Sequence, residues 1–111
     1  MQEVIPRGNC QGMPDSTFAA LWSAALSVPD RDVFLSDPAF SAVPLDERGS
    51  VWDVAHMTIR GIRQHTGLSQ AKFALHFCIP RRSVEDWEAG ARTCPDYLRL
   101  LLAQAVGLYQ R

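Results

Sequence analysis

The stretch from residue 70 to residue 88, QAKFALHFCIPRRSVEDWE, constrains the fold of this chain more than any other part of it. Ser69 can cap a short helix that runs through about residue 76. Pro80 marks the start of a second helix, which reaches about residue 89 and ends at Gly90. Only three or four residues remain between the two helices, so they must cross one another closely.

The apolar residues of this stretch fit such a crossing. Two helices that meet at a steep angle need a very small side chain where they touch, and Ala74 stands at that place in the first helix. The apolar positions that both helices would share with their neighbours are Phe73, Phe77, Ile79, Val84 and Trp87. The spacing therefore predicts a helix-turn-helix with Ala74, Val84 and Trp87 in its core.

The segments before and after this motif also predict helices. Ser50 begins a capping box and predicts a helix that runs on to Gly67, a residue suited to the left-handed conformation that ends helices. After the motif, Thr93 or Cys94 can cap a last helix that has Pro95 in its first position and runs to about residue 106.

We expect an all-α protein, a small helical bundle in three parts. Residues 1–14 are predicted to form a disordered tail, residues 15–48 an N-terminal helical segment, and residues 50–107 the helix-turn-helix domain. In the N-terminal segment, Asp15 or Ser16 is expected to cap the first helix.

Shorter helical turns are expected after Pro29, which ends that first helix. Asp30 can cap one turn, and Asp37 followed by Pro38 is an N-cap with proline in the first helical position. Residues 45–49 are predicted to form a loop. Since no alternation of period two has a useful length, no sheet is expected. The N-terminal segment is expected to pack onto the domain or to form a dimer surface.

Composition and charge limit the class of function. With 111 residues, of which 47% are apolar, the chain suits one small domain or a domain with an added helical segment. No apolar run approaches the roughly 18 residues of a membrane span, and the first residues do not resemble a secretory leader, so we expect a cytoplasmic protein without a membrane partner. Residues 1–50 carry three basic and seven acidic side chains, whereas residues 51–111 carry eight basic and five acidic ones. A polyanion would therefore bind to the second half.

Two pieces of the second half, GLSQAKFA at residues 67–74 and IPRRSVEDWEAGART at residues 79–93, resemble the lambda-repressor-like, or Xre-type, helix-turn-helix family. Members typically have G-L-[ST]-Q before the first motif helix and W-E-x-G-x-R-x-P after the second. The resemblance covers about residues 56–106 and implies a DNA-binding helical domain.

The resemblance also implies roles for individual residues. Arg81 and Arg82 match positions early in the recognition helix that reach base edges in the major groove, and Asp86 matches a further base-facing position, with Glu85 beside it. Arginine can bond bidentately to guanine, and a carboxylate can accept from cytosine N4. Gln70, at the start of the first motif helix, matches a residue that contacts a DNA phosphate.

Further phosphate contacts are expected around these positions. Arg92 and Thr93 match the loop that lies along the phosphate backbone. The other polar residues expected near phosphates are Ser69, Lys72 and Ser83.

Three positions are implied to be structural. Arg63 and Glu88 match a pair that forms an internal salt bridge in many relatives, so Arg63 is given no DNA role. Cys78 stands where relatives often have a glycine in the left-handed conformation. A non-glycine residue there costs about 1 kcal/mol, so the turn is expected to differ slightly from that of the relatives.

These features predict a sequence-specific, double-stranded DNA-binding transcriptional regulator, most simply a repressor that acts as a homodimer on an inverted repeat. A dimer would place its recognition helices about 34 Å apart, one turn of DNA. The sequence leaves open a different class, an antitoxin-like or phage-accessory protein-interaction module whose acidic N-terminal segment binds a protein partner.

Enzymatic chemistry and cofactors are not expected. No nucleophile with a base, phosphate-binding loop or pair of acids in a plausible cleft stands out. His76, Cys78 and Cys94 lack both a fourth ligand and a suitable spacing for a metal, so no metal is expected and both cysteines are predicted to be small packing residues.

Overall fold

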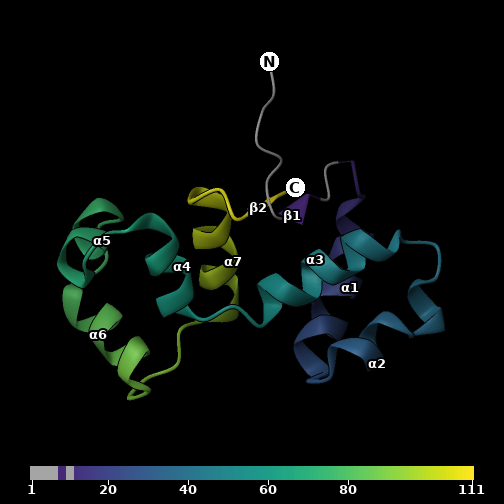
Figure 1. Ribbon diagram of the computed structural model, residues 1–111, viewed down its shortest axis with the longest axis horizontal. Helices are drawn as coiled ribbons and strands as arrows, with labels where there is room; N and C mark the ends of the chain where they lie inside the picture. The colour runs from purple at the N-terminus through teal and green to yellow at the C-terminus, as the bar shows by residue number, and fades with distance from the viewer. Residues whose placement is uncertain (1–7, 10–11) are drawn as a thin grey trace.

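The computed structural model describes residues 8–9 and 12–111, and its regular secondary structure is helical apart from two strands of two residues each, which confirms the expected all-α class. Figure 1 shows two groups of helices that lie side by side. We call the group from α1 to α3 the N-terminal lobe and the group from α4 to α7 the C-terminal lobe. Among the described residues, no helix has the length and apolar character needed to cross a membrane.

The N-terminal lobe begins with α1 (Asp15–Ser27), which starts directly after Pro14. Neither Asp15 nor Ser16 caps it; both lie inside its first turn, so the predicted cap is wrong. The next two elements do begin at the predicted aspartates. Asp30 accepts hydrogen bonds at the start of α2 (Arg31–Leu35), and Asp37 does so at the start of the 3₁₀ helix η1 (Pro38–Phe40).

The third helix differs from the prediction. Residues 45–49 belong to α3 (Leu45–Ala55), so they form no loop, and the predicted boundary between residues 48 and 50 falls inside a helix. Ser50 lies inside this helix and so is not its N-cap, and its hydroxyl donates to the Asp46 carbonyl at 3.0 Å. The overlooked start signal is Pro44 followed by Asp46 and Glu47, acids that suit the positive end of a helix dipole.

The helix predicted from residue 50 to residue 66 is in fact divided in two. After α3 ends at His56, the chain starts α4 (Ile59–Thr66), whose N-cap Thr58 accepts from the Gly61 amide at 3.0 Å. Gly67 then ends α4 in the left-handed conformation, as predicted.

The C-terminal lobe continues with α5 (Gln70–His76), α6 (Arg81–Ala89) and α7 (Asp96–Ala105). The first two have their expected bounds, and Gly90 ends α6 in the left-handed conformation. The last helix starts one residue later than expected, because Pro95 is its N-cap and not its first residue.

One hydrophobic core runs through both lobes, and α3 links them by packing against α1, α2 and α7. Its largest fully buried side chains are Tyr109, Phe34, Phe73, Leu21, Ile62, Val51 and Val84. Within the N-terminal lobe, the Trp52 indole donates to the Val28 carbonyl at 2.9 Å, and a ring nitrogen of His56 lies 2.8 Å from the Ala25 carbonyl. These contacts fasten the end of α3 to the end of α1.

The two ends of the described chain meet beside α1. Strand β1 (Gly8–Asn9) pairs in parallel with β2 (Tyr109–Gln110), a pairing of two residues per strand that the sequence did not indicate. Arg111 forms an ion pair with Asp15 and lies over the Phe18 ring. The predicted tail mostly concerns residues 1–7 and 10–11, which lie outside the described residues.

Candidate nucleic-acid interface

The two-helix unit α5–α6 is held together by a small, well-packed contact. Ser69 caps α5 by accepting from the Lys72 amide, at 3.2 Å. Ala74 and Val84 are buried, and the Ile79 amide donates to the Ala74 carbonyl at 2.9 Å, which draws the turn back against α5. Trp87 is half-buried against the same core. The side chains predicted to fill the crossing therefore lie there.

The turn between the helices contains Cys78 in the left-handed conformation, with φ of +56°. Among the described residues it is the only non-glycine with a positive φ. Its side chain is exposed, so the prediction that Cys78 is a packing residue is wrong. The backbone conformation alone determines which residue suits this position.

Replacing Cys78 with glycine should therefore raise the free energy of unfolding by about 1 kcal/mol, because glycine adopts this conformation without a Cβ clash. Urea denaturation followed by circular dichroism measures the change. The matched control is Cys78→Ala, which removes the thiol and keeps the Cβ, and should change little. Equal stability of the glycine and alanine variants would contradict the argument.

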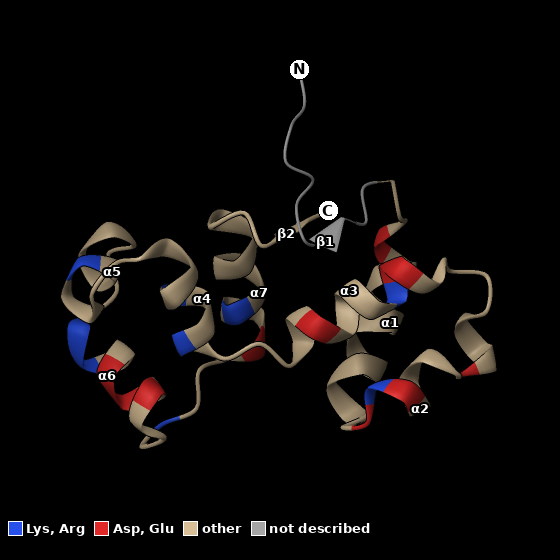
Figure 2. Cartoon of the chain, in the orientation of Figure 1, with Lys and Arg blue, Asp and Glu red and all other residues tan. Residues whose placement is uncertain are grey.

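The exposed surface of α6 carries arginines on its first turn and acids one turn later. The side chains of Arg81 and Arg82 are 63% and 82% exposed. Arg81 pairs with Glu85 at 2.9 Å and Arg82 with Asp86 at 3.3 Å, both along the helix. Figure 2 shows these opposite charges following one another along α6. Ion pairs along one helix that have an exposed arginine contribute only a few tenths of a kcal/mol, so an external partner can replace them, although the Asp86 side chain is only 19% exposed.

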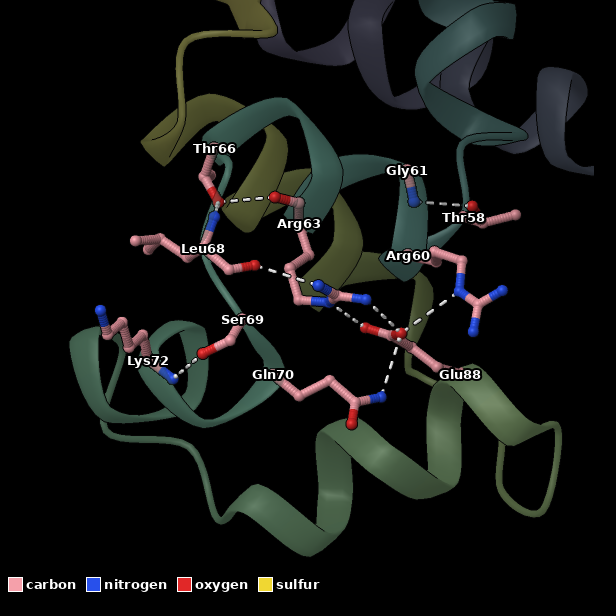
Figure 3. Close-up of polar contacts among 10 residues, drawn as sticks. All are labelled: Thr58, Arg60, Gly61, Arg63, Thr66, Leu68, Ser69, Gln70, Lys72 and Glu88. Carbon is pink, nitrogen blue, oxygen red and sulfur yellow. Dashed lines mark hydrogen bonds and ion pairs between the residues drawn. The ribbon is translucent and has the colours of Figure 1, made fainter.

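Behind α6, the carboxylate of Glu88 joins three helices (Figure 3). Its side chain is 1% exposed. Arg63 of α4 donates to it twice, from Nε at 2.6 Å and from Nη2 at 2.8 Å, and also donates to the Leu68 carbonyl. Gln70 of α5 donates to the same carboxylate at 3.2 Å, and Arg60 of α4 does so at 3.4 Å. The pair that the resemblance implies is thus the centre of a larger network that fixes α6 against α4 and α5.

This network sets the charge state of Glu88. Hydrogen bonds from Arg63, with smaller contributions from Gln70 and Arg60, hold the pKa of Glu88 below its usual range, although burial opposes them. Since the pKa is lower in the folded chain than in the unfolded chain, the network stabilises the fold fully above the unfolded value of about 4.3. That stabilisation is lost as the pH falls through the folded value.

The difference in unfolding free energy between the natural protein and Glu88→Gln should therefore be constant above about pH 5 and shrink below about pH 4. Urea titrations at a series of pH values measure it. The same comparison in an Arg63→Gln background is the control and should show a much weaker pH dependence. A difference that grows as the pH falls would contradict the assigned direction.

The other predicted phosphate-contacting residues lie on the same lobe, but they differ in exposure and in whether their polar atoms already have partners. Lys72, Arg92 and Thr93 are exposed, and Ser83 is half-buried on α6. The oxygen of Ser69 is used in its cap, and the amide nitrogen of Gln70 donates to Glu88, so both have structural partners.

Two arginines that the sequence analysis gave no role also shape this region. Arg60 lies one turn before Arg63 on α4, so the two side chains are neighbours on the helix surface. This spacing could have indicated from the sequence that Arg60 also approaches Glu88. Arg99 of α7 donates to the carbonyls of Ala55 and Met57, at 3.0 and 2.7 Å, and so holds the junction between α3 and α4. No sequence pattern marks a contact of this kind, which joins residues far apart in the chain.

No metal centre is formed by the cysteines and histidines that the structure describes. Within residues 8–9 and 12–111, no three side chains of His, Cys, Asp or Glu are grouped so that they could hold a metal ion. Cys94 is buried, and this burial raises the pKa of its thiol, which disfavours the thiolate that metals bind.

Comparisons with protein-family models, with curated proteins and with solved structures found no match to this chain.

Proposed function

We propose that this protein binds double-stranded DNA sequence-specifically and regulates transcription, with α6 entering the major groove. The observation that carries the proposal is the pair Arg81 and Arg82 on the first turn of α6, exposed while the same helix is fixed from behind by Glu88. A rigid helix that presents arginines at its start suits base reading, since geometry determines which bases they reach.

The ion pairs along α6 favour selective over indiscriminate binding. In water, Glu85 and Asp86 neutralise the arginines, so this helix has little excess positive charge to attract any phosphate. At a matching site, the arginines can donate to guanine while the acids accept from cytosine N4. Lys72, Arg92 and Thr93 then supply backbone contacts that position the helix.

In this proposal the regulator is a cytoplasmic homodimer. It represses transcription by occluding the promoter. Supporting evidence comes from α7, where Tyr97 and Leu101 lie one turn apart and are 67% and 56% exposed. Apolar side chains exposed together on one helix suit a contact with a second copy.

Replacing Leu101 with Asp should therefore yield a monomer and lower the affinity for an inverted repeat about tenfold or more, because the half-sites would be bound independently. Size-exclusion chromatography with light scattering gives the oligomeric state. The matched control is Val33→Asp on α2, where an apolar side chain is 60% exposed. A natural protein that is monomeric on DNA would contradict the dimer.

A protein-interaction module is the second candidate, favoured by the exposed Val33 and Leu45 on the acidic N-terminal lobe. It accounts for that surface but gives no reason for two exposed arginines at the start of α6.

Selection from random duplex DNA at about 150 mM salt tests the proposal, at a salt concentration where weak phosphate contacts no longer dominate. Enrichment of a short palindrome containing guanines is expected. No enrichment and no retained DNA would contradict DNA binding and favour the interaction module.

A further inference from the structure

A groove of about 560 Å³ lies where the two lobes meet, between the α3–α4 junction and the loop that follows α6. The wall formed by the α3–α4 junction is held in place by hydrogen bonds. Arg99 binds the Ala55 and Met57 carbonyls on one side, and Thr58 caps α4 beside them. The side chains that the proposal assigns to base reading on α6 do not line this groove.

The charged side chains that line the groove leave a net positive charge, because both carboxylates are already paired. Three arginines, Arg60, Arg92 and Arg99, face two carboxylates, Glu88 and Asp96. Arg63 already neutralises Glu88 from behind, and Asp96 is paired with Arg99. The charges that remain available are those of Arg60 and Arg92.

These two guanidinium groups have free hydrogen-bond donors. The side chain of Arg60 is 61% exposed and uses only Nε, in a long contact of 3.4 Å to Glu88. Arg92 is exposed, and its side chain has no hydrogen-bond or ion-pair partner in the part of the chain that the structure describes. Arginine forks of this kind bind phosphate and carboxylate groups bidentately.

Besides the polar His56, Thr58 and Thr93, the rest of the lining is apolar and includes Met57, Ile59 and the half-buried Trp87. A flat ring can lie against such a surface while its charged group reaches the mouth of the groove. The two arginines and the apolar side chains together thus suit a molecule with one anionic end and one flat apolar end.

We propose that this groove is a binding site for a small phosphorylated molecule that carries a flat apolar group, with Arg60 and Arg92 holding the phosphate. Its regulatory consequence rests on the proposed function: Arg92 is also expected to contact a DNA phosphate, so the ligand and DNA compete for it.

Titration of isotope-labelled full-length protein with adenosine monophosphate, without DNA, tests the site by nuclear magnetic resonance. We expect saturable shifts in the amides of Thr58, Arg60 and Thr93 and in the Trp87 indole. Adenosine, which lacks the phosphate, should bind much more weakly. Arg60→Gln and Arg92→Gln should each weaken adenosine monophosphate about fivefold or more, whereas Arg31→Gln on the N-terminal lobe should not.

The absence of saturable shifts, or affinities unchanged in Arg60→Gln and Arg92→Gln, would overturn the proposal. The proposal would also be overturned if the groove bound a DNA backbone phosphate instead. In that case Arg60→Gln would weaken duplex binding, while adenosine monophosphate would cause no shifts. Because the first titration contains no DNA, its result stands whether or not the protein binds a duplex. If the protein does bind a duplex, a saturating concentration of adenosine monophosphate should lower the affinity of the protein for that duplex.

Discussion

Replacing Arg81 and Arg82 together with alanine should lower the affinity for a selected duplex about 100-fold or more, while the protein stays folded. Each arginine that reads a guanine contributes roughly 1–3 kcal/mol of discrimination, so two of them account for an effect of this size. Stability should change by less than about 1 kcal/mol, because both arginine side chains are exposed and ion pairs along one helix contribute little. Fluorescence anisotropy at fixed salt measures the affinity, and urea denaturation measures the stability.

The matched control is Arg31→Ala, which removes an exposed arginine of the N-terminal lobe that is also ion-paired, here with Asp53 at 2.9 Å. Its DNA affinity should be close to that of the natural protein. If the double variant bound the selected duplex as tightly as the natural protein does, then α6 would not read the DNA. Loss of folding in the double variant would show that these arginines are structural.

Replacing Glu88 with alanine should lower the free energy of unfolding by about 3 kcal/mol, the largest stability effect that we expect from one substitution at the interface. The change leaves Arg63, whose side chain is only 16% exposed, without its partner, and frees Gln70. A buried charge that loses its partner is costly, and α6 loses its attachment to α4 and α5. Urea denaturation measures the loss, and DNA affinity should fall with it.

A double-mutant cycle with Arg63→Ala separates the pair from the rest of the network. Removing both charges should cost clearly less than the two single losses added together, because no unpaired charge remains buried. Additive losses would mean that the two side chains stabilise the fold independently. The exposed pair Arg81–Glu85 provides the comparison, since its coupling should be only a few tenths of a kcal/mol.

Local signals account for the parts of the fold that could be predicted. Ser69, Gly67 and Gly90 define helix ends through short-range hydrogen bonds and backbone conformation, so α5 and α6 have their expected bounds. The left-handed Cys78 and the Arg63–Glu88 pair were accessible only through the family resemblance, because neither follows from periodicity.

The remaining features depend on contacts between distant residues. Thr58 is a local signal for the start of α4, but the junction between α3 and α4 is also held by Arg99, more than forty residues away in the chain. The β1–β2 pairing likewise joins the first described residues to the C-terminal strand. At the candidate interface, Gln70 was expected to contact phosphate, yet its amide turns inward to Glu88, a partner that only the assembled lobe brings near.

Mapping the surface that contacts DNA tests the central claim most directly. Isotope-labelled protein would be titrated with a random-sequence duplex of about 20 base pairs at about 50 mM salt, because the phosphate contacts expected from Lys72 and Arg92 strengthen at low salt and should bring the duplex to the same surface. We predict shifts concentrated at the start of α5, along the exposed side of α6 and in the loop from residue 90 to residue 95. Shifts confined to the N-terminal lobe, or no shifts at all, would contradict the claim that the α5–α6 unit binds DNA.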